Sequence, residues 1–307
     1  MILGVLHLHL DFQTLTDAVG LGAIYALMAV GIGLVFGVLR LVNFAYGQLV
    51  MAGAYTLAYT SGWPLAASIL ACFGVVVGLS LAMETTVFRP LRGQSPAVML
   101  VTTFAISFLL QAIALILDLR NGQLGEVAAS LTTLAQPISI FGAQVREITL
   151  VELGVAIGAL LLLALLLMRT TIGLHTRAAA SDFRTARLLG VRANRVIGVS
   201  VVLSGLIAAA VAVMLTVQLP LVTPDFALRD TIVVLVGVVV GGIDRLWTAT
   251  LGGFSIGFVS GLINGLLPTD KTVYLPSAVF VLVILVLLLR PQGLFAWGRR
   301  AAVPDRV

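Results

Sequence analysis

The sequence MRTTIGLHTRAAASDFRTARLLGVRANR, residues 168–195, separates two of the most apolar runs of the chain and contains six arginines. A single arginine at the centre of a bilayer costs about 2.5–3.5 kcal/mol even on the lenient insertion scale, so a segment with six lies outside the membrane. By the positive-inside rule, a loop so rich in arginine faces the cytoplasm. The stretch predicts a cytoplasmic loop over residues 169–195, set within one transmembrane domain that covers residues 1–307.

The composition places the whole chain in a membrane. Of its residues, 60% are hydrophobic and only 10% are charged, and the mean hydropathy is +1.14. Soluble domains carry about 25% charged residues, so the chain is predicted to be an integral membrane protein. The formal net charge is +5, but the basic residues gather in loops between apolar runs. This pattern indicates membrane topology and not binding to nucleic acid.

The runs without charge predict the membrane spans. Residues 18–39, for example, are long enough to cross a hydrocarbon core of about 30 Å at about 1.5 Å per helical residue. Residues 41–83 are interrupted by Ser61-Gly62-Trp63-Pro64 and predict two spans joined by a tight turn. The other predicted spans are 93–117, 153–168, 196–217, 247–267 and 273–289.

One segment is too short for this pattern. Only 13 residues separate Asp230 from Asp244, about 20 Å of helix, so a short or broken span is predicted near 229–244. Counting it gives about nine crossings, with the amino terminus outside and the carboxyl terminus in the cytoplasm. If the segment is re-entrant, about eight crossings remain. The predicted fold is an all-α polytopic bundle of about eight to nine transmembrane helices.

The two halves of the chain show weak internal symmetry. Each contains a Gly-rich hairpin with a polar connector, at 43–48 and at 244–246, and a hairpin around a basic loop, in reversed order. Transporters built from inverted repeats carry interrupted, Gly-rich segments at corresponding positions near the substrate path. Inverted repeats are one interpretation, and chance similarity of apolar helices is the other.

A short helix is predicted inside the cytoplasmic loop, over residues 178–191. Ser181 or Asp182 would cap its start, and Gly190 stands where a helix would stop. A short exposed helix with apolar residues, beneath a membrane domain, is suited to binding a partner. The alternative is that the helix lies flat on anionic lipid with its arginines on the headgroups.

No motif in the sequence predicts an enzyme. There is no HExxH, no GxSxG and no GxxxxGK[ST] loop to hold the phosphates of a nucleotide, and the one lysine, Lys271, lacks a glycine loop. The carboxylates stand at the ends of spans, and no pair of membrane-embedded carboxylates is predicted. We therefore expect no catalytic, metal or cofactor site in this chain. If ATP drives transport, another chain hydrolyses it.

Polar residues and glycines mark two helix faces within the spans. Thr103, Ser107 and Gln111 follow one another at four-residue spacing with Thr102 beside them, so this stripe is expected to face the bundle interior. It either lines a substrate path or forms structural hydrogen bonds. Asn264 is also expected to need an interior partner. Helix packing is predicted for the glycines that recur at every fourth residue, Gly253, Gly257, Gly261 and Gly265.

The order and spacing of several short motifs resemble the permease subunits of branched-chain amino acid ABC importers along nearly the whole chain. Each motif alone is weak, and their combination is highly specific. They are Tyr25-Ala26-Leu27, VNFAYGQ at 42–48, RPLRG at 89–93, the loop 177–190, Gly241-Gly242, Gly252-Gly253 and RPQGLF at 290–295.

This resemblance implies a multi-pass subunit of the bacterial inner membrane that works in a larger assembly. The implied partners are a second related permease, two cytoplasmic ATPase subunits that bind the ATP, and a periplasmic substrate-binding protein, with membrane lipid around the complex. The loop would couple to the ATPase through Arg177, Asp182, Arg184, Arg187, Leu188, Leu189 and Gly190. The candidate substrate path comprises Asn43, Tyr46, Gln48, Thr102, Thr103, Ser107, Gln111 and Asn264.

The sequence departs from the family in a way that bears on the substrate. After Asn43-Phe44-Ala45 the family commonly has His, Gly and Glu, whereas this chain has Tyr46, Gly47 and Gln48. A titratable pair is thus replaced by a neutral one. Branched-chain or other apolar amino acids are the expected substrates, with urea or short amides as the alternative. A secondary transporter or channel that works alone would require buried acidic residues or a filter, and neither is evident in the sequence.

Overall fold

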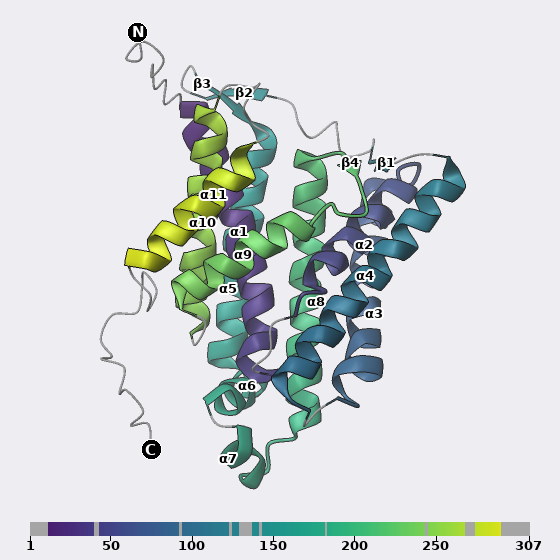
Figure 1. Ribbon diagram of the computed structural model, residues 1–307, viewed down its shortest axis with the longest axis vertical. Coiled ribbons are helices and arrows are strands. Elements are labelled where there is room, and N and C mark those ends of the chain that lie inside the picture. Colours follow the sequence, from purple (N-terminus) through teal and green to yellow (C-terminus); the bar gives the residue numbers. More distant parts are fainter. Residues whose placement is uncertain are drawn as a thin grey trace.

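The computed structural model describes residues 12–39, 43–91, 94–122, 125–128, 137–140, 143–181, 183–242, 245–267 and 274–289. Within these ranges the chain is a helical bundle (Figure 1), as predicted. The helices are α1 (Phe12–Leu39), α2 (Tyr46–Tyr59), α3 (Leu65–Met83), the π-helix η1 (Glu84–Phe88), α4 (Pro96–Asn121), α5 (Glu147–Arg169), α6 (Thr171–Ser181), α7 (Phe183–Leu188), α8 (Ala193–Gln218), α9 (Leu228–Gly241), α10 (Leu246–Leu266) and α11 (Leu275–Leu289).

Among the described residues, six helices are long and apolar enough to cross a membrane. They are Gln13–Leu39, Leu65–Phe88, Ala97–Asn121, Thr149–Arg169, Asn194–Gln218 and Leu246–Leu266. The helices α2 and α9 have 14 residues each and α11 has 15, so α2 and α9 are each about 21 Å long, less than the hydrocarbon core. The short element expected near 229–244 is α9. The count of eight to nine crossings and the inverted repeats stay predictions.

The core of the bundle is built on α1 and α8. The most apolar window of α1 is 83% buried and that of α8 is 61% buried, whereas the windows of α4 and α5 are each 17% buried. The apolar side chains that α4 and α5 expose therefore point away from the protein, where lipid tails contact them in a bilayer. Figure 1 shows α1 running between α10 on one side and α8 on the other.

The glycine face of α10 lies directly against α1. A Cβ atom placed on Gly257 would come within 2.8 Å of the Leu21 carbonyl oxygen, and one on Gly261 within 2.5 Å of the Ala18 Cα. Gly253 and Gly265 lie against α1 in the same way. Without side chains on this face the two backbones approach closely, so α1 and α10 form one rigid pair.

Two small antiparallel sheets lie in the connections at the end of the bundle opposite α6 and α7 (Figure 1). Strand β1 (Glu126–Val127) pairs with β4 (Leu221–Val222), and β2 (Pro137–Ile140) forms a hairpin with β3 (Ala143–Arg146). The described part of the connection between α4 and α5 therefore contains three short strands. The β1–β4 pair ties the end of α4 to the end of α8.

The helix predicted over residues 178–191 is wrong in its bounds. The structure has two helices there, α6 (Thr171–Ser181) and α7 (Phe183–Leu188). The start is earlier because the Thr170 hydroxyl accepts a hydrogen bond from the Gly173 amide at 3.1 Å, which caps α6 at its first turn. Ser181, expected as a starting cap, is instead the last residue of α6, and Asp182, the alternative, lies outside the described residues.

Candidate functional site

The loop between α5 and α8 projects α6 and α7 from one end of the bundle (Figure 1). α6 turns the side of Gly173, Thr176 and Ala179 toward the bundle, where all three are buried and the helix contacts α1, α5 and α8. At the end of α7, Leu188 is 85% exposed and Leu189 is 80% exposed. Two adjacent leucines are thus left bare outside the apolar spans.

Gly190 ends α7 in the backbone conformation that the sequence indicated. Its φ is +87°, in the region where an L side chain is strained. The Val191 amide donates a hydrogen bond to the Ala186 carbonyl at 3.1 Å, and the Leu189 amide donates to the Thr185 carbonyl at 3.1 Å. The first of these bonds is that of a Schellman motif, which turns the chain sharply after a helix. The turn holds the two exposed leucines at the tip of the loop.

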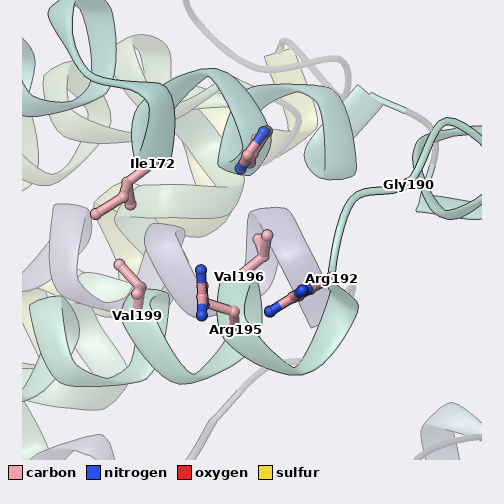
Figure 2. Close-up of a pocket in the computed structure, with 7 residues that line it drawn as sticks. Ile172, Gly190, Arg192, Arg195, Val196 and Val199 are labelled. Carbon is pink, nitrogen blue, oxygen red and sulfur yellow. The ribbon is translucent and has the colours of Figure 1, made fainter.

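A small cationic pocket lies directly behind this turn (Figure 2). Its volume is about 140 Å³. The floor is apolar, and the rim carries two guanidinium groups and one imidazole. Ile172 and His175 come from α6, Gly190 from the turn, and Arg192, Arg195, Val196 and Val199 from the start of α8. Guanidinium groups bind carboxylates in bidentate geometry, so the pocket is suited to an acidic side chain.

The expected coupling residues that the structure describes lie on α6, on α7 and at the turn after α7. Arg177 is exposed on α6, and Leu188, Leu189 and Gly190 are exposed at the end of α7. The backbones of Arg184 and Arg187 lie within α7. Arg192 and Arg195 belong to the arginine-rich loop, but neither they nor His175 were among the expected coupling residues. No local signal could have found them as a group, because they meet only when α6 packs beside α8.

A second candidate site lies inside the bundle, where α2 and α9 begin. Gly47 in the first turn of α2 packs so closely on α9 that a Cβ atom there would lie 2.9 Å from the Ala227 carbonyl oxygen and would overlap Thr231. The hydroxyl of Tyr25, in the middle of α1, donates a 2.6 Å hydrogen bond to Asp230 in the first turn of α9. Two helix amino termini, each with a partial positive charge, therefore meet beside the middle of α1.

Unpartnered polar groups gather at this junction. Tyr46 and Gln48, in the first turn of α2, are both 0% exposed. The Tyr46 hydroxyl and both polar atoms of the Gln48 amide lack hydrogen-bond partners within the described structure. Asn43 is buried as well, and its side-chain oxygen accepts a hydrogen bond from the Ala45 amide at 3.1 Å. Leaving such a group unpaired costs about 1–3 kcal/mol, so the junction carries an energetic cost that a polar partner would remove.

The stripe on α4 lies next to this junction. Thr103 and Ser107 are buried, and Thr102 and Gln111 are half-buried. The Phe104 ring stacks on the Phe44 ring with centroids 4.0 Å apart, which joins the stripe to the start of α2. The hydroxyls of both threonines donate to carbonyls of their own helix.

Asn264 does not join the stripe. It is exposed in the last turn of α10, so the expectation of an interior partner is wrong. Gly261 and Gly265 pack on α1, and Asn264 lies on another face of the helix.

Three carboxylates accept hydrogen bonds from side chains of distant helices, and the sequence had not indicated this. Asp118 accepts a hydrogen bond from the Tyr55 hydroxyl at 2.7 Å, and Glu152 accepts bonds from the Gln218 amide nitrogen at 3.0 and 2.9 Å. Asp230 is the third; it is half-buried and accepts a hydrogen bond from the Tyr25 hydroxyl at 2.6 Å. Each stands near a helix end, as expected from the sequence, but a tyrosine or glutamine from a distant helix covers it. The sequence predicted no pair of membrane-embedded carboxylates, and these three each bond to a different helix.

These features define a multi-pass helical membrane protein with an interior polar junction and two short helices that project from one end. Residues 14–289 match the family model described as the permease component of branched-chain amino acid transport systems, and the chain belongs to this family. It is thus a membrane-embedded permease subunit of an ABC importer, located in the inner membrane.

Individual relatives cover the chain almost end to end. The high-affinity branched-chain amino acid transport system permease protein LivH of Escherichia coli (strain K12) is 27% identical over 296 residues, covering 92% of this chain and 94% of the relative. The corresponding protein BraD of Pseudomonas aeruginosa is 28% identical over 294 residues, with the same coverage. The solved structure of PsaBC from Streptococcus pneumoniae in complex with Fab aligns with 91% of each chain, at 14% identity and a TM-score of 0.48.

Proposed function

We propose that this subunit forms half of the translocation path of an importer for branched-chain or other apolar amino acids. A second related permease would supply the other half, and a periplasmic binding protein would deliver the substrate. Two cytoplasmic ATPase subunits would bind and hydrolyse the ATP, so this chain itself would hold no cofactor. The match of residues 14–289 to the permease family supports the transport function.

The surface at the end of α7 supports the coupling role, and it is the observation on which this part of the proposal rests. The bare Leu188 and Leu189 stand beside a pocket rimmed by Arg192, Arg195 and His175. A partner that fits this surface has an apolar groove for the two leucines and a carboxylate for the pocket. The resulting interface would have an apolar centre without water and a charged rim. The rigid turn at Gly190 would transmit movement of the partner to α8.

The distribution of arginines supports an orientation with α6 and α7 in the cytoplasm. Arg169, Arg177, Arg192 and Arg195 all lie at this end of the bundle, and Arg245 precedes α10 at the same end. Loops of this kind are retained on the cytoplasmic side. The amino terminus would then be outside, and the carboxyl terminus, beyond the described residues, would be in the cytoplasm.

The interior junction supports a path for a polar or zwitterionic solute. Broken helices in transporters direct their amino termini at anionic groups of the substrate, and α2 and α9 both begin here. The side chains of Tyr46 and Gln48 offer neutral donors and an acceptor. Because the Gln48 amide can pair with another amide in both directions, urea and short amides are a second candidate substrate class.

Uptake by the complete reconstituted complex tests the proposal. Proteoliposomes that contain this chain, its partner permease and the ATPase subunits are supplied with binding protein and a panel of amino acids and amides. We expect uptake of leucine, isoleucine or valine that requires ATP. Uptake of an amide alone would select the second substrate class. Uptake by this chain without any ATPase, driven by an ion gradient, would contradict the proposal and favour a secondary transporter that uses the buried carboxylates.

A further inference from the structure

An apolar groove of about 410 Å³ opens between α1, α5, α6 and α10, at the end of the bundle that carries α6 and α7. It is separate from the cationic pocket behind Gly190, and none of the residues proposed for the substrate path lines it. Its walls are formed by aliphatic side chains such as Leu34 of α1, Leu163 and Leu167 of α5 and Leu246 of α10.

The groove runs parallel to the helix axes. On α1 its lining extends from Val30 to Val38, and on α5 from Leu160 to Met168. Eight residues of helix rise about 12 Å, so both walls follow the same length of the bilayer. A groove of this direction and composition matches a lipid tail, which also lies along the membrane normal.

The depth of the groove comes from glycines on α1. A Cβ atom on Gly37 would meet only the Ala180 Cβ, at 4.0 Å, so the space beside it is open. A Cβ atom on Gly33 would lie 2.9 Å from the Leu246 side chain across the groove. The lack of side chains on this part of α1 keeps a channel between α1 and α5 that larger residues would fill.

The end of the groove is polar. Arg177 and Thr176 of α6 line it there, and Trp247 in the first turn of α10 is 73% exposed beside them. Tryptophan gathers at the level of lipid headgroups, and arginine near a membrane surface attracts anionic lipid. Thus an apolar channel leads to a cation and an indole at the membrane interface.

Other ligands fit the groove less well. A free amino acid would need a partner for its ammonium group, and no carboxylate is among the lining residues. A polar amide would leave the aliphatic walls unmatched. We infer that the groove holds an acyl chain of an anionic phospholipid whose phosphate lies on Arg177. This lipid would fill the space between the rigid α1–α10 pair and the helix α6 that carries the docking loop.

Native mass spectrometry of the full-length chain purified in detergent tests this inference. Phosphatidylglycerol and phosphatidylcholine with identical acyl chains are added, and bound lipid is read from the protein mass. We expect retained phosphatidylglycerol on the wild type and loss of that adduct in both Gly37→Phe and Ala164→Phe, which fill the groove from opposite walls. The control Gly158→Phe should keep the adduct, because Gly158 of α5 faces open space outside the groove.

The headgroup is tested separately. Arg177→Ala should lower phosphatidylglycerol binding to the level of phosphatidylcholine, whereas Arg229→Ala, which removes an equal charge elsewhere, should leave it unchanged. If one groove-filling variant does not fold, the other decides the result. Wild-type adducts in the folded groove variants, or equal binding of the two lipids to the wild type, would overturn the inference.

Discussion

The Tyr25 hydroxyl of α1 and the Asp230 carboxylate of α9 share a 2.6 Å hydrogen bond inside the bundle. This bond connects α1 to the first turn of α9. Helix α9 begins beside α1, at the junction where α2 also begins. Removal of the donor would leave a half-buried carboxylate with one partner fewer, and this costs more than loss of a neutral pair.

We therefore expect Tyr25→Phe to lower the stability of the folded chain by about 1–3 kcal/mol. Adding Asp230→Asn to this variant should restore part of the loss, because a neutral amide is cheaper to bury than a charge. Thermal unfolding of the purified protein, followed by fluorescence-detected size exclusion, measures both effects. Tyr274→Phe is the control, since Tyr274 is 65% exposed. Equal melting temperatures for Tyr25→Phe and the control would contradict the prediction.

Substitution of Gln48 by leucine can distinguish a structural role of this residue from a role in transport. Leucine has a similar size and no polar atoms, so Gln48→Leu should raise the melting temperature by removing an unpartnered buried amide. If Gln48 contacts the substrate, the same variant should reduce uptake by the reconstituted complex. Gln111→Leu should have a smaller effect on both measurements, because that side chain is half-buried at the edge of the α4 stripe. Wild-type uptake in Gln48→Leu would leave the residue outside the path.

Local signals in the sequence account for what could be predicted. Glycine at every fourth position identifies the packing face of α10, and a glycine after an apolar helix end identifies the turn at Gly190. The start of α6 at Thr171 was missed because it depends on a single Thr170 cap within a uniformly basic loop. The interior start of α2 was missed because residues 41–59 carry no charge, and an apolar run looks the same whether it spans the membrane or begins halfway.

Features that depend on distant helices could not be predicted. The sequence places Glu152 and Asp230 at span ends, but only packing brings Gln218 and Tyr25 over them. The cationic pocket likewise requires α6 and α8 to lie side by side. In both cases residues far apart in the sequence come together, and the residue pattern of a single sequence does not predict which distant residues will be in contact.

The pocket behind Gly190 gives a prediction about charge. Arg195→Glu should weaken co-purification of the ATPase subunits, because it would repel the carboxylate that we expect in the pocket. Arg195→Lys should keep most of the binding, and the wild-type interaction should weaken as salt is raised. Arg229→Glu, at an exposed site on α9, should have no effect. Wild-type co-purification by Arg195→Glu at low salt would remove the pocket from the interface.

The orientation of the loop can be tested by labelling single cysteines. Thr185 is exposed on α7, and the native Cys72 is 0% exposed and protected. Cysteine introduced by Thr185→Cys should react with an impermeant thiol reagent only after the cells are opened. Cysteine introduced by Leu221→Cys, in β4 at the opposite end, should react in intact cells. The reverse labelling pattern would overturn the proposed orientation.

The turn at Gly190 provides the sharpest test of coupling. A valine there would be forced into the left-handed region at a cost of about 1–2 kcal/mol, although no atom lies close enough to clash with its Cβ. Gly190→Val should therefore distort the tip of the loop and abolish substrate-stimulated ATP hydrolysis while the membrane domain stays folded. Gly198→Val is the matched control, because Gly198 also faces open space but lies within α8.

Leu189→Asp provides an independent variant at the same surface. It should detach the ATPase subunits, since an acidic side chain would enter the apolar groove expected to receive the leucine, whereas Leu221→Asp at the far end should not. If α7 docks on lipid instead, Gly190→Val should have little effect on its binding, because the arginines still reach the headgroups. Normal ATP hydrolysis and normal co-purification in both Gly190→Val and Leu189→Asp would refute the coupling assignment.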